Sequence, residues 1–259
     1  MSDHGRFIWY ELMTPDVAGA KAFYGPVLGW TFEEMDGGGM AYTIASVGPG
    51  AGVAGLMALS DELKSAGVPP NWSAYVDVDD VDAALQKVKA LGGSVELEPM
   101  DIPGVGRFAV ITDPGGAAIA VMTPAPMDEI PPAPAAGTHG TAGWRELYAA
   151  DLESAFAFYS QLFGWRKDSD VDMGPMGAYR LFANQDGQVG GMMTKPAEVP
   201  VPAWLYYFVV DDIDAGAARV KAGGGQVLNG PMEVPGGDWI VQAVDPQGAM
   251  FALMGKKAA

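Results

Sequence analysis

The sequence predicts an α+β protein made of four βαβββ modules, and two observations lead to this fold class. The 259-residue chain repeats itself once over most of its length. Within each repeat, strand-like segments outnumber helical ones and the same order of elements occurs twice. A doubly wound parallel sheet, which needs strands and helices in equal alternation, is therefore not expected.

The repeat is visible when the chain is compared with itself. At an offset of 135, residues 9–30 match 144–165 at 10 of 22 positions. At an offset of 132, residues 72–122 match 204–254 at 23 of 51 positions. The period is far too long for a solenoid, so the chain contains a duplicated domain.

The first module opens with an alternating strand over residues 7–13, followed by a helix for which Asp16 is the expected N-cap. Apolar residues at helical spacing lead to Gly29, which suits a helix C-terminus. Strands are expected near 30–34, 40–47 and 53–58.

The second module repeats this order. A strand at 73–78 leads to a helix opened by Asp80 and closed by Gly92-Gly93. Strands follow near 94–98, 107–112 and 117–123. N-capping of this helix explains most of the acidic cluster Asp77, Asp79, Asp80 and Asp82.

In the second copy, the acidic motif Asp168-x-Asp170-x-Asp172 is interpreted as a solvated hairpin rather than a calcium-binding loop.

The extent of the two sequence copies predicts two tandem domains, residues 1–123 and 141–259. Residues 124–140 contain five prolines and little periodicity, which indicates a semi-rigid linker.

Composition excludes several function classes. The net charge of −17 disfavours nucleic acid and anionic membranes as partners and favours cationic ligands. The chain has no cysteine, which removes disulfides and thiolate chemistry, and only two histidines, His4 and His139. The first residues carry no basic, apolar leader, so a cytoplasmic location is expected.

Three features together resemble the vicinal oxygen chelate superfamily of glyoxalase I, bleomycin-resistance proteins and extradiol dioxygenases. They are the four βαβββ modules, the Asp-x7-Tyr-x4-Gly-Trp pattern from Asp16 and Asp151, and the Asp-Pro-x-Gly motif at Asp113 and Asp245. The resemblance covers both copies. It implies that paired modules form a cup-shaped sheet that holds a ligand, which in enzymatic members includes a divalent metal. It also implies that two-module chains pair as dimers; because four modules in this chain could complete that assembly alone, a monomer is preferred and a dimer is the alternative.

The family's metal-ligand positions can be transferred to this chain, but they carry no suitable donors. They fall on six residues: Trp9, Ser73 and Ala120 in copy one, and Trp144, Leu205 and Ala252 in copy two. A catalytic metal needs several nitrogen or oxygen ligands, and only Ser73 offers an oxygen. We therefore expect no metal site and no cofactor.

Strand alternation predicts what lines the cups instead. If the transferred positions face inward, aromatic and thioether side chains surround one glutamate in each cup, while Ala120 and Ala252 leave room. The predicted ligand-binding residues are Trp9, Glu11, Ser73, Tyr75 and Met122 in copy one, and Trp144, Glu146, Tyr207 and Met254 in copy two. Such a lining suits a planar or cationic guest, although the same residue types also form ordinary cores.

Glu11 and Glu146 are the candidate catalytic residues. A buried carboxylate is rare without a partner, so a tyrosine hydroxyl, a backbone amide or an arginine could make them structural. A desolvated glutamate could instead abstract a proton or hold a ligand's ammonium group.

The favoured hypothesis is a protein that binds a small aromatic or cationic molecule in metal-free cups. The alternative is a glyoxalase- or dioxygenase-like enzyme that uses an atypical metal site or a glutamate general base. A third hypothesis is an interaction module whose cups are filled by side chains.

Overall fold

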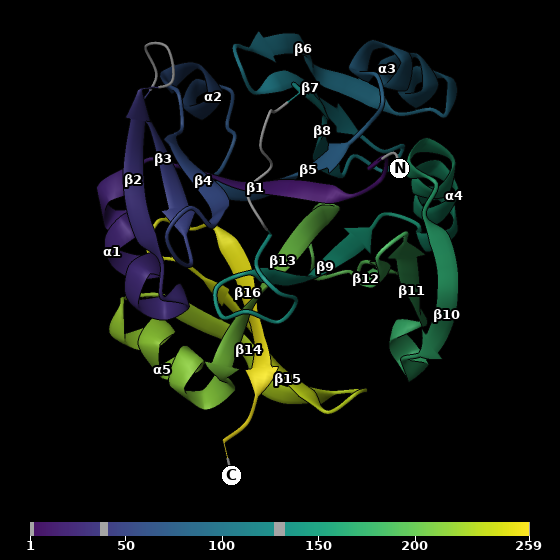
Figure 1. The fold of residues 1–259 in the computed structure, drawn as a ribbon. Coiled ribbons are helices and arrows are strands. Elements are labelled where there is room, and N and C mark those ends of the chain that lie inside the picture. The colour runs from purple at the N-terminus through teal and green to yellow at the C-terminus, as the bar shows by residue number, and fades with distance from the viewer. Residues whose placement is uncertain (1–2, 37–40, 127–132, 259) are drawn as a thin grey trace. The chain divides into compact units, whose positions relative to one another are not determined.

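The computed structural model describes residues 3–36, 41–126 and 133–258, and its elements follow the four-module order (Figure 1). The first copy comprises β1 (Phe7–Thr14), α1 (Val17–Leu28), β2 (Thr31–Asp36), β3 (Ala41–Ser46), β4 (Gly52–Ala58), α2 (Asp61–Ser65), β5 (Asn71–Asp77), α3 (Val81–Ala90), β6 (Ser94–Ile102), β7 (Gly106–Thr112) and β8 (Ala118–Pro124). The second comprises β9 (Ala142–Ala149), α4 (Leu152–Phe163), β10 (Arg166–Asp172), the 3-10 turn η1 (Gly174–Met176), β11 (Ala178–Asn184), β12 (Gly187–Thr194), β13 (Ala203–Asp212), α5 (Ile213–Ala222), β14 (Gln226–Val234), β15 (Asp238–Val244) and β16 (Met250–Lys256).

The strands form two eight-stranded mixed sheets, which confirms the predicted α+β class. The orders are β2-β3-β4-β1-β5-β8-β7-β6 and β10-β11-β12-β9-β13-β16-β15-β14, so the second sheet repeats the first. In each module the first strand pairs in parallel with the last, as in β1 with β4, and hairpins join the others. The short helix α2, capped by Ser60, was not predicted.

Local capping explains where the helices begin and end. Asp16 and Asp80, the two predicted N-caps, accept hydrogen bonds from the amides of Gly19 and Ala83. Gly29 ends α1 in the left-handed conformation, with φ of 69°. The neighbouring acid Asp82 does not cap a helix but pairs with Arg107.

The compact units of the structure combine segments from both sequence copies. One unit contains residues 1–9, 73–129 and 145–205, and the other contains 10–72, 130–144 and 206–259. We call them unit 1 and unit 2. The domain limits at 123 and 141 stay a prediction from the sequence.

In unit 2, helices α1 and α5 lie side by side (Figure 1). Beneath them, Trp72 Nε1 donates to the Tyr24 hydroxyl (2.9 Å), which donates to Asp245 Oδ2 (3.0 Å). Asp245 belongs to the second Asp-Pro-x-Gly motif, and its Oδ1 accepts the amides of residues 247 and 249. The aspartate of this motif therefore stabilises the turn of the motif and also accepts a hydrogen bond from Tyr24 of the other sequence copy.

Unit 1 has the corresponding arrangement around helices α3 and α4, where Trp204 Nε1 donates to the Tyr159 hydroxyl at 3.2 Å. The two tryptophans that follow the first helix of each copy, Trp30 and Trp165, are buried core residues. Their indole Nε1 atoms donate to the carbonyls of Gly140 and Gly5, respectively. Each tryptophan therefore fixes the segment that precedes β9 or β1.

The two histidines occupy equivalent positions in the copies. His4 Nδ1 accepts from the amide of Asp79 (3.3 Å) in unit 1, and His139 Nδ1 accepts from the amide of Asp211 (3.2 Å) in unit 2. Both histidines therefore help to hold the segments before β1 and β9. Among the described residues, no helix has the length and apolar character needed to cross a membrane.

Candidate functional site

Glu11 lies on β1 in unit 2, where its side chain is buried. The Tyr42 hydroxyl, on β3, donates to Glu11 Oε2 at 3.0 Å. The tyrosine reaches across β4 at Gly55, which is in register with Glu11. A side chain at residue 55 would overlap the Tyr42 hydroxyl, so the glycine is what permits this contact.

Unit 1 contains the equivalent residues. Glu146 on β9 is buried and is in register with Gly191 on β12. A side chain at residue 191 would overlap the ring of Tyr179 on β11. The sequence reasoning missed both tyrosines, although each copy pairs a tyrosine with a glycine on the next strand.

Four of the residues predicted to line the first cup, Trp9, Ser73, Tyr75 and Met122, belong to unit 1, whereas Glu11 belongs to unit 2. Tyr75 and Met122 form a buried apolar cluster with Ala120, and Trp9, Ile8, Phe108 and Val110 pack against it. The rings of Tyr75 and Phe108 have centroids 5.8 Å apart. Ser73 is half-buried two residues before Tyr75 on the same strand.

Asp77 adds a carboxylate to the end of this face. It is in register with Met122, and its side chain is half-buried. Burial is the largest of the effects that raise the pKa of Asp77, and the negative charges of Asp3 and Asp79 add to it.

The corresponding face in unit 2 is more polar. The Tyr207 hydroxyl accepts a hydrogen bond from Gln242 Nε2 at 2.8 Å, and Gln242 stands where copy one has Val110. Val209 is in register with Met254, so these two side chains continue the row that Tyr207 begins. Trp144 is half-buried on β9.

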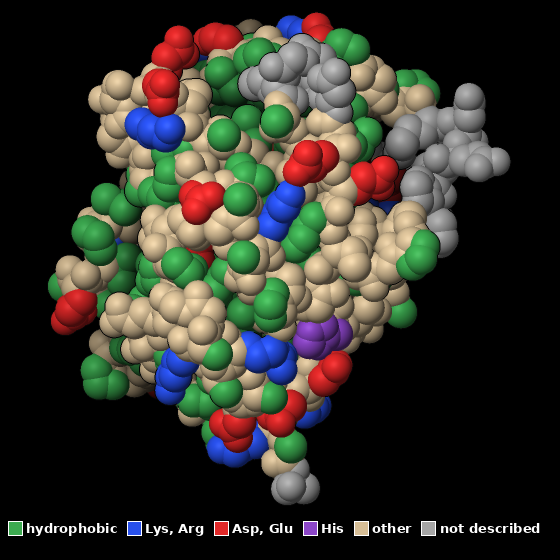
Figure 2. Space-filling model, turned by 90° about the vertical axis from the view of Figure 1, so that its left-hand side faces the viewer, with side chains coloured by type: hydrophobic (Ala, Val, Ile, Leu, Met, Phe, Trp, Pro, Cys, Tyr) green, Lys and Arg blue, Asp and Glu red, His purple; other side chains and the backbone are tan. Residues whose placement is uncertain are grey.

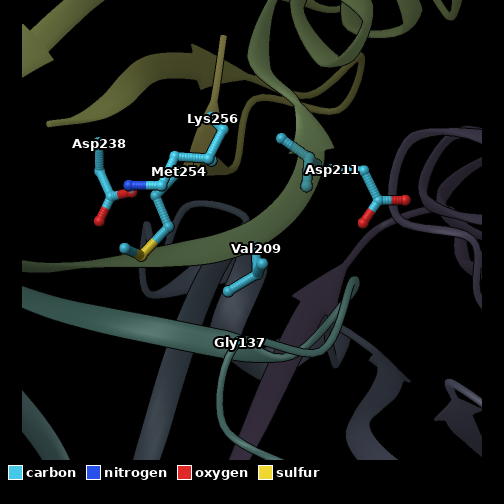
Figure 3. A pocket seen from close by; sticks show the side chains of 8 residues that line it. Gly137, Val209, Asp211, Asp238, Met254 and Lys256 are labelled. Carbon is cyan, nitrogen blue, oxygen red and sulfur yellow. The ribbon is translucent and has the colours of Figure 1, made fainter. Parts of the chain in front are cut away.

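A pocket of about 330 Å³ opens at the end of this row (Figure 3). Val209 and Met254 supply its apolar wall, and the backbone at Gly137 passes beneath them. Lys256 and Asp238 lie together at its rim, with Lys256 Nζ 2.6 Å from Asp238 Oδ1. Asp211 is the third charged lining residue, and its side chain is largely exposed. Met254 is the predicted ligand-binding residue that lines this pocket; the sequence reasoning did not single out its polar neighbours.

The residues at the transferred ligand positions do not suit the divalent metal that the resemblance implies. Ala120, Leu205 and Ala252, which occupy three of the six transferred ligand positions, are buried side chains without a donor atom. Over residues 3–36, 41–126 and 133–258, no group of three or more histidine, aspartate or glutamate side chains is arranged to hold a metal ion. The side chains at the transferred positions therefore cannot coordinate a catalytic metal.

A model of the glyoxalase/bleomycin resistance protein/dioxygenase superfamily matches residues 6–121 and 141–253. The chain belongs to this superfamily. The two matched ranges correspond to the two sequence copies, so the superfamily assignment holds for each copy separately. This confirms the resemblance noted from the sequence.

Relatives in this superfamily match nearly the whole chain. "Putative glyoxylase CFP32" of Mycobacterium tuberculosis is 36% identical over 248 residues, which cover 95% of this chain and 93% of that protein. "Anthracycline biosynthesis protein DnrV" of Streptomyces peucetius is 33% identical over 263 residues, covering 96% and 93%. The chain is thus related to both.

Solved structures share the fold at lower identity. A Mn(II)-bound glyoxalase from Novosphingobium aromaticivorans superposes with a TM-score of 0.66 at 18% identity, covering all of this chain and 84% of that one. The 2,2',3-trihydroxybiphenyl 1,2-dioxygenase of Sphingomonas wittichii gives 0.67 at 15% identity, with 98% and 91% covered. At these identities the likeness establishes the fold alone.

Proposed function

We propose that this superfamily member binds a small aromatic or cationic organic molecule on the faces formed by its predicted cup residues. The observation that carries the proposal is the grouping of Trp9, Tyr75 and Met122 in unit 1, with Asp77 beside Met122. Aromatic faces next to a carboxylate attract cations through ring quadrupole and charge, and they stack with flat ligands.

Charge and pocket shape support the same proposal in unit 2. The pocket beside Met254 has a volume at the lower end of the range for small-molecule sites. The net charge of −17 raises the local concentration of cations and lowers that of anions. On the face shown in Figure 2, acidic and basic side chains are interspersed with hydrophobic ones.

The name of one relative supports an aromatic ligand. This relative carries a name that places it in the biosynthesis of anthracyclines, which are flat polycyclic aromatic compounds. We extend only the chemical class, a fused aromatic ring system, to this chain.

Isothermal titration with three naphthalene compounds of similar size tests the proposal. The probes are 2-naphthylmethylammonium, 2-naphthylmethanol and 2-naphthoate, which carry a positive, a neutral and a negative group. Saturable binding of the first two, with the naphthoate weakest, is expected because of the aromatic faces and the negative field. Absence of saturable binding for all three would refute the proposal.

The two copies offer matched variants. Trp9→Leu and Trp144→Leu should each weaken the total binding, because each removes an aromatic surface from one predicted face. Trp239→Leu is the control, since Trp239 lies between Asp238 and Ile240 on β15 and alternation turns it to the opposite face, where Lys257 covers its ring. Equal effects of all three substitutions would contradict a specific role for Trp9 and Trp144.

The alternative is an enzyme in which the buried Glu11, hydrogen-bonded to Tyr42, acts as a general base. If a bound compound is converted, Glu11→Gln and Glu146→Gln should abolish turnover while the dissociation constant stays unchanged. Unchanged turnover in both variants would assign the two glutamates a structural role.

A further inference from the structure

We propose that the pocket of unit 2 is selective for a small organic ammonium ion with an apolar body, and that Gly143 and Met254 determine its shape. The inference rests on the proposed small-molecule function and narrows it to one site and one ligand class. It also makes the two sequence copies functionally unequal.

Comparison of the copies shows how the pocket wall differs. The offset of 135 places Ile8 in copy one where Gly143 stands in copy two. In unit 1, Ile8 packs against the buried cluster that contains Met122. In unit 2, a Cβ added to Gly143 would lie 2.6 Å from Met254 Sδ and 2.8 Å from Val209 Cγ2. Met254 therefore lies directly against the backbone at Gly143, in space that an isoleucine would take.

The second difference is the charged rim. Lys256 and Asp238 correspond to Pro124 and Gly106, so unit 1 has no ion pair at this place. Lys256 Nζ contacts Asp238 Oδ1 and also donates to the carbonyl of Gly237 at 3.3 Å. Its side chain is 68% exposed, so it can move into solvent at little cost when another cation approaches Asp238.

The rim favours a positive ligand over a negative one. The pocket lining contains two aspartates, Asp238 and Asp211, and one lysine, so its net charge is negative. Asp211 is held beside His139, with its Oδ2 3.4 Å from Nδ1. A ligand ammonium gains a carboxylate partner here, whereas a ligand carboxylate would meet like charge.

The wall behind the rim fits the apolar part of such a ligand. Val209 and Met254 present branched and thioether side chains, and an unbranched methionine adapts to different shapes. An isoleucine at position 143 would push the Met254 side chain away from the strand and into the pocket. The ligand class is therefore an amine carried on a compact hydrocarbon or aromatic body.

Methionine methyl NMR provides a direct test. The full chain is labelled at the methionine ¹³C methyl groups, Met254 and Met122 are assigned with Met254→Leu and Met122→Leu, and 2-naphthylmethylammonium is added. The Met254 signal should shift and saturate with the dissociation constant found by titration, while the Met122 signal shifts with a separate, weaker constant.

Three variants complete the test. Gly143→Ile should weaken the Met254-linked binding by at least about tenfold, the equivalent of about 1.4 kcal/mol. Gly48→Ile is the matched control. Gly48 belongs to the same unit, and a Cβ added to it would have no other atom within 4 Å. Asp238→Asn leaves the pocket wall intact and should weaken the ammonium probe about tenfold but not 2-naphthylmethanol.

The outcomes separate this inference from the proposed function. Saturable binding that leaves the Met254 methyl signal unmoved, or that Gly143→Ile and Asp238→Asn do not change, refutes the ammonium pocket while small-molecule binding stands. The same holds if 2-naphthoate shifts Met254 as strongly as the ammonium probe. No saturable binding of any probe removes both.

Discussion

The hydroxyl group of Tyr24 joins two buried polar groups in unit 2, and removing it gives a sharp test of how this unit is stabilised. The hydroxyl accepts from Trp72 Nε1 and donates to Asp245 Oδ2, and all three side chains are buried. Burial and the Asp245 carboxylate raise the pKa of Tyr24 well above its ordinary value of 10, so the hydroxyl stays protonated. Tyr24→Phe deletes only this one oxygen.

The expected cost follows from the partners that are left. The substitution leaves the Trp72 indole N–H and one carboxylate oxygen of Asp245 buried without this partner. Each unsatisfied group costs about 1–3 kcal/mol, so the free energy of unfolding should fall by about 2–6 kcal/mol in total. The Asp245 turn itself should persist, because Oδ1 keeps its two backbone amides.

Urea denaturation followed by tryptophan fluorescence measures this loss. Asp245→Asn is the partner variant for a double-mutant cycle. It replaces the charged carboxylate by a neutral amide, so that loss of the Tyr24 hydroxyl no longer leaves a buried charge without this partner. In that background Tyr24→Phe should cost less, with a coupling of about 0.5–3 kcal/mol. A loss below about 0.5 kcal/mol for Tyr24→Phe, or the same loss in both backgrounds, would refute the reasoning.

Three further predictions concern local features. Gly55→Ala should destabilise the protein by about 1–3 kcal/mol in urea denaturation, because the new methyl group displaces the Tyr42 hydroxyl from Glu11, whereas Gly48→Ala should be nearly neutral. Gly164→Ala should cost about 1 kcal/mol, measured by thermal denaturation, because Gly164 ends α4 at a φ of 72°, and a cost no larger than that of Gly48→Ala would contradict this. Hydrogen bonds from Arg180 and then Lys167 lower the pKa of Asp170 from 3.8 to about 2. Because the folded-state pKa is the lower one, this contribution to stability is complete above about pH 4 and is lost as the pH falls toward 2. The difference in unfolding free energy between the wild type and Asp170→Asn should therefore shrink over that range, and a constant difference would contradict the prediction.

The fold was predictable because its signals are local. Asp16 and Asp80 mark helix starts through hydrogen bonds to amides three residues away, and Gly29 marks a helix end through its own backbone conformation. Because the sequence is duplicated, the helices and strands predicted for the first copy could also be predicted at the equivalent residues of the second copy. The helix α2 fell outside it, because this five-residue helix has no buried side chain and hence no apolar periodicity.

The site was less predictable because its contacts depend on strand register. Tyr42 meets Glu11 across 31 residues, and only the pairing of both strands with β4 at Gly55 brings them together. The Tyr24–Asp245 bond spans 221 residues and joins the two copies. A repeat shows which residues are equivalent, but it does not show whether a residue pairs with its own copy or with the other.

The composition of the compact units has a consequence for how the chain folds during synthesis. Unit 1 needs residues up to 205, and unit 2 needs both residues 10–72 and the last segment of the chain. An emerging first copy therefore exposes apolar faces, such as that of α1 around Phe23, whose ring partner Phe251 is translated only near the end. At about 5–20 residues per second this partner appears roughly ten or more seconds later. The first copy thus spends that interval in need of shielding, and a fragment cut at the proline-rich linker contains incomplete parts of both units.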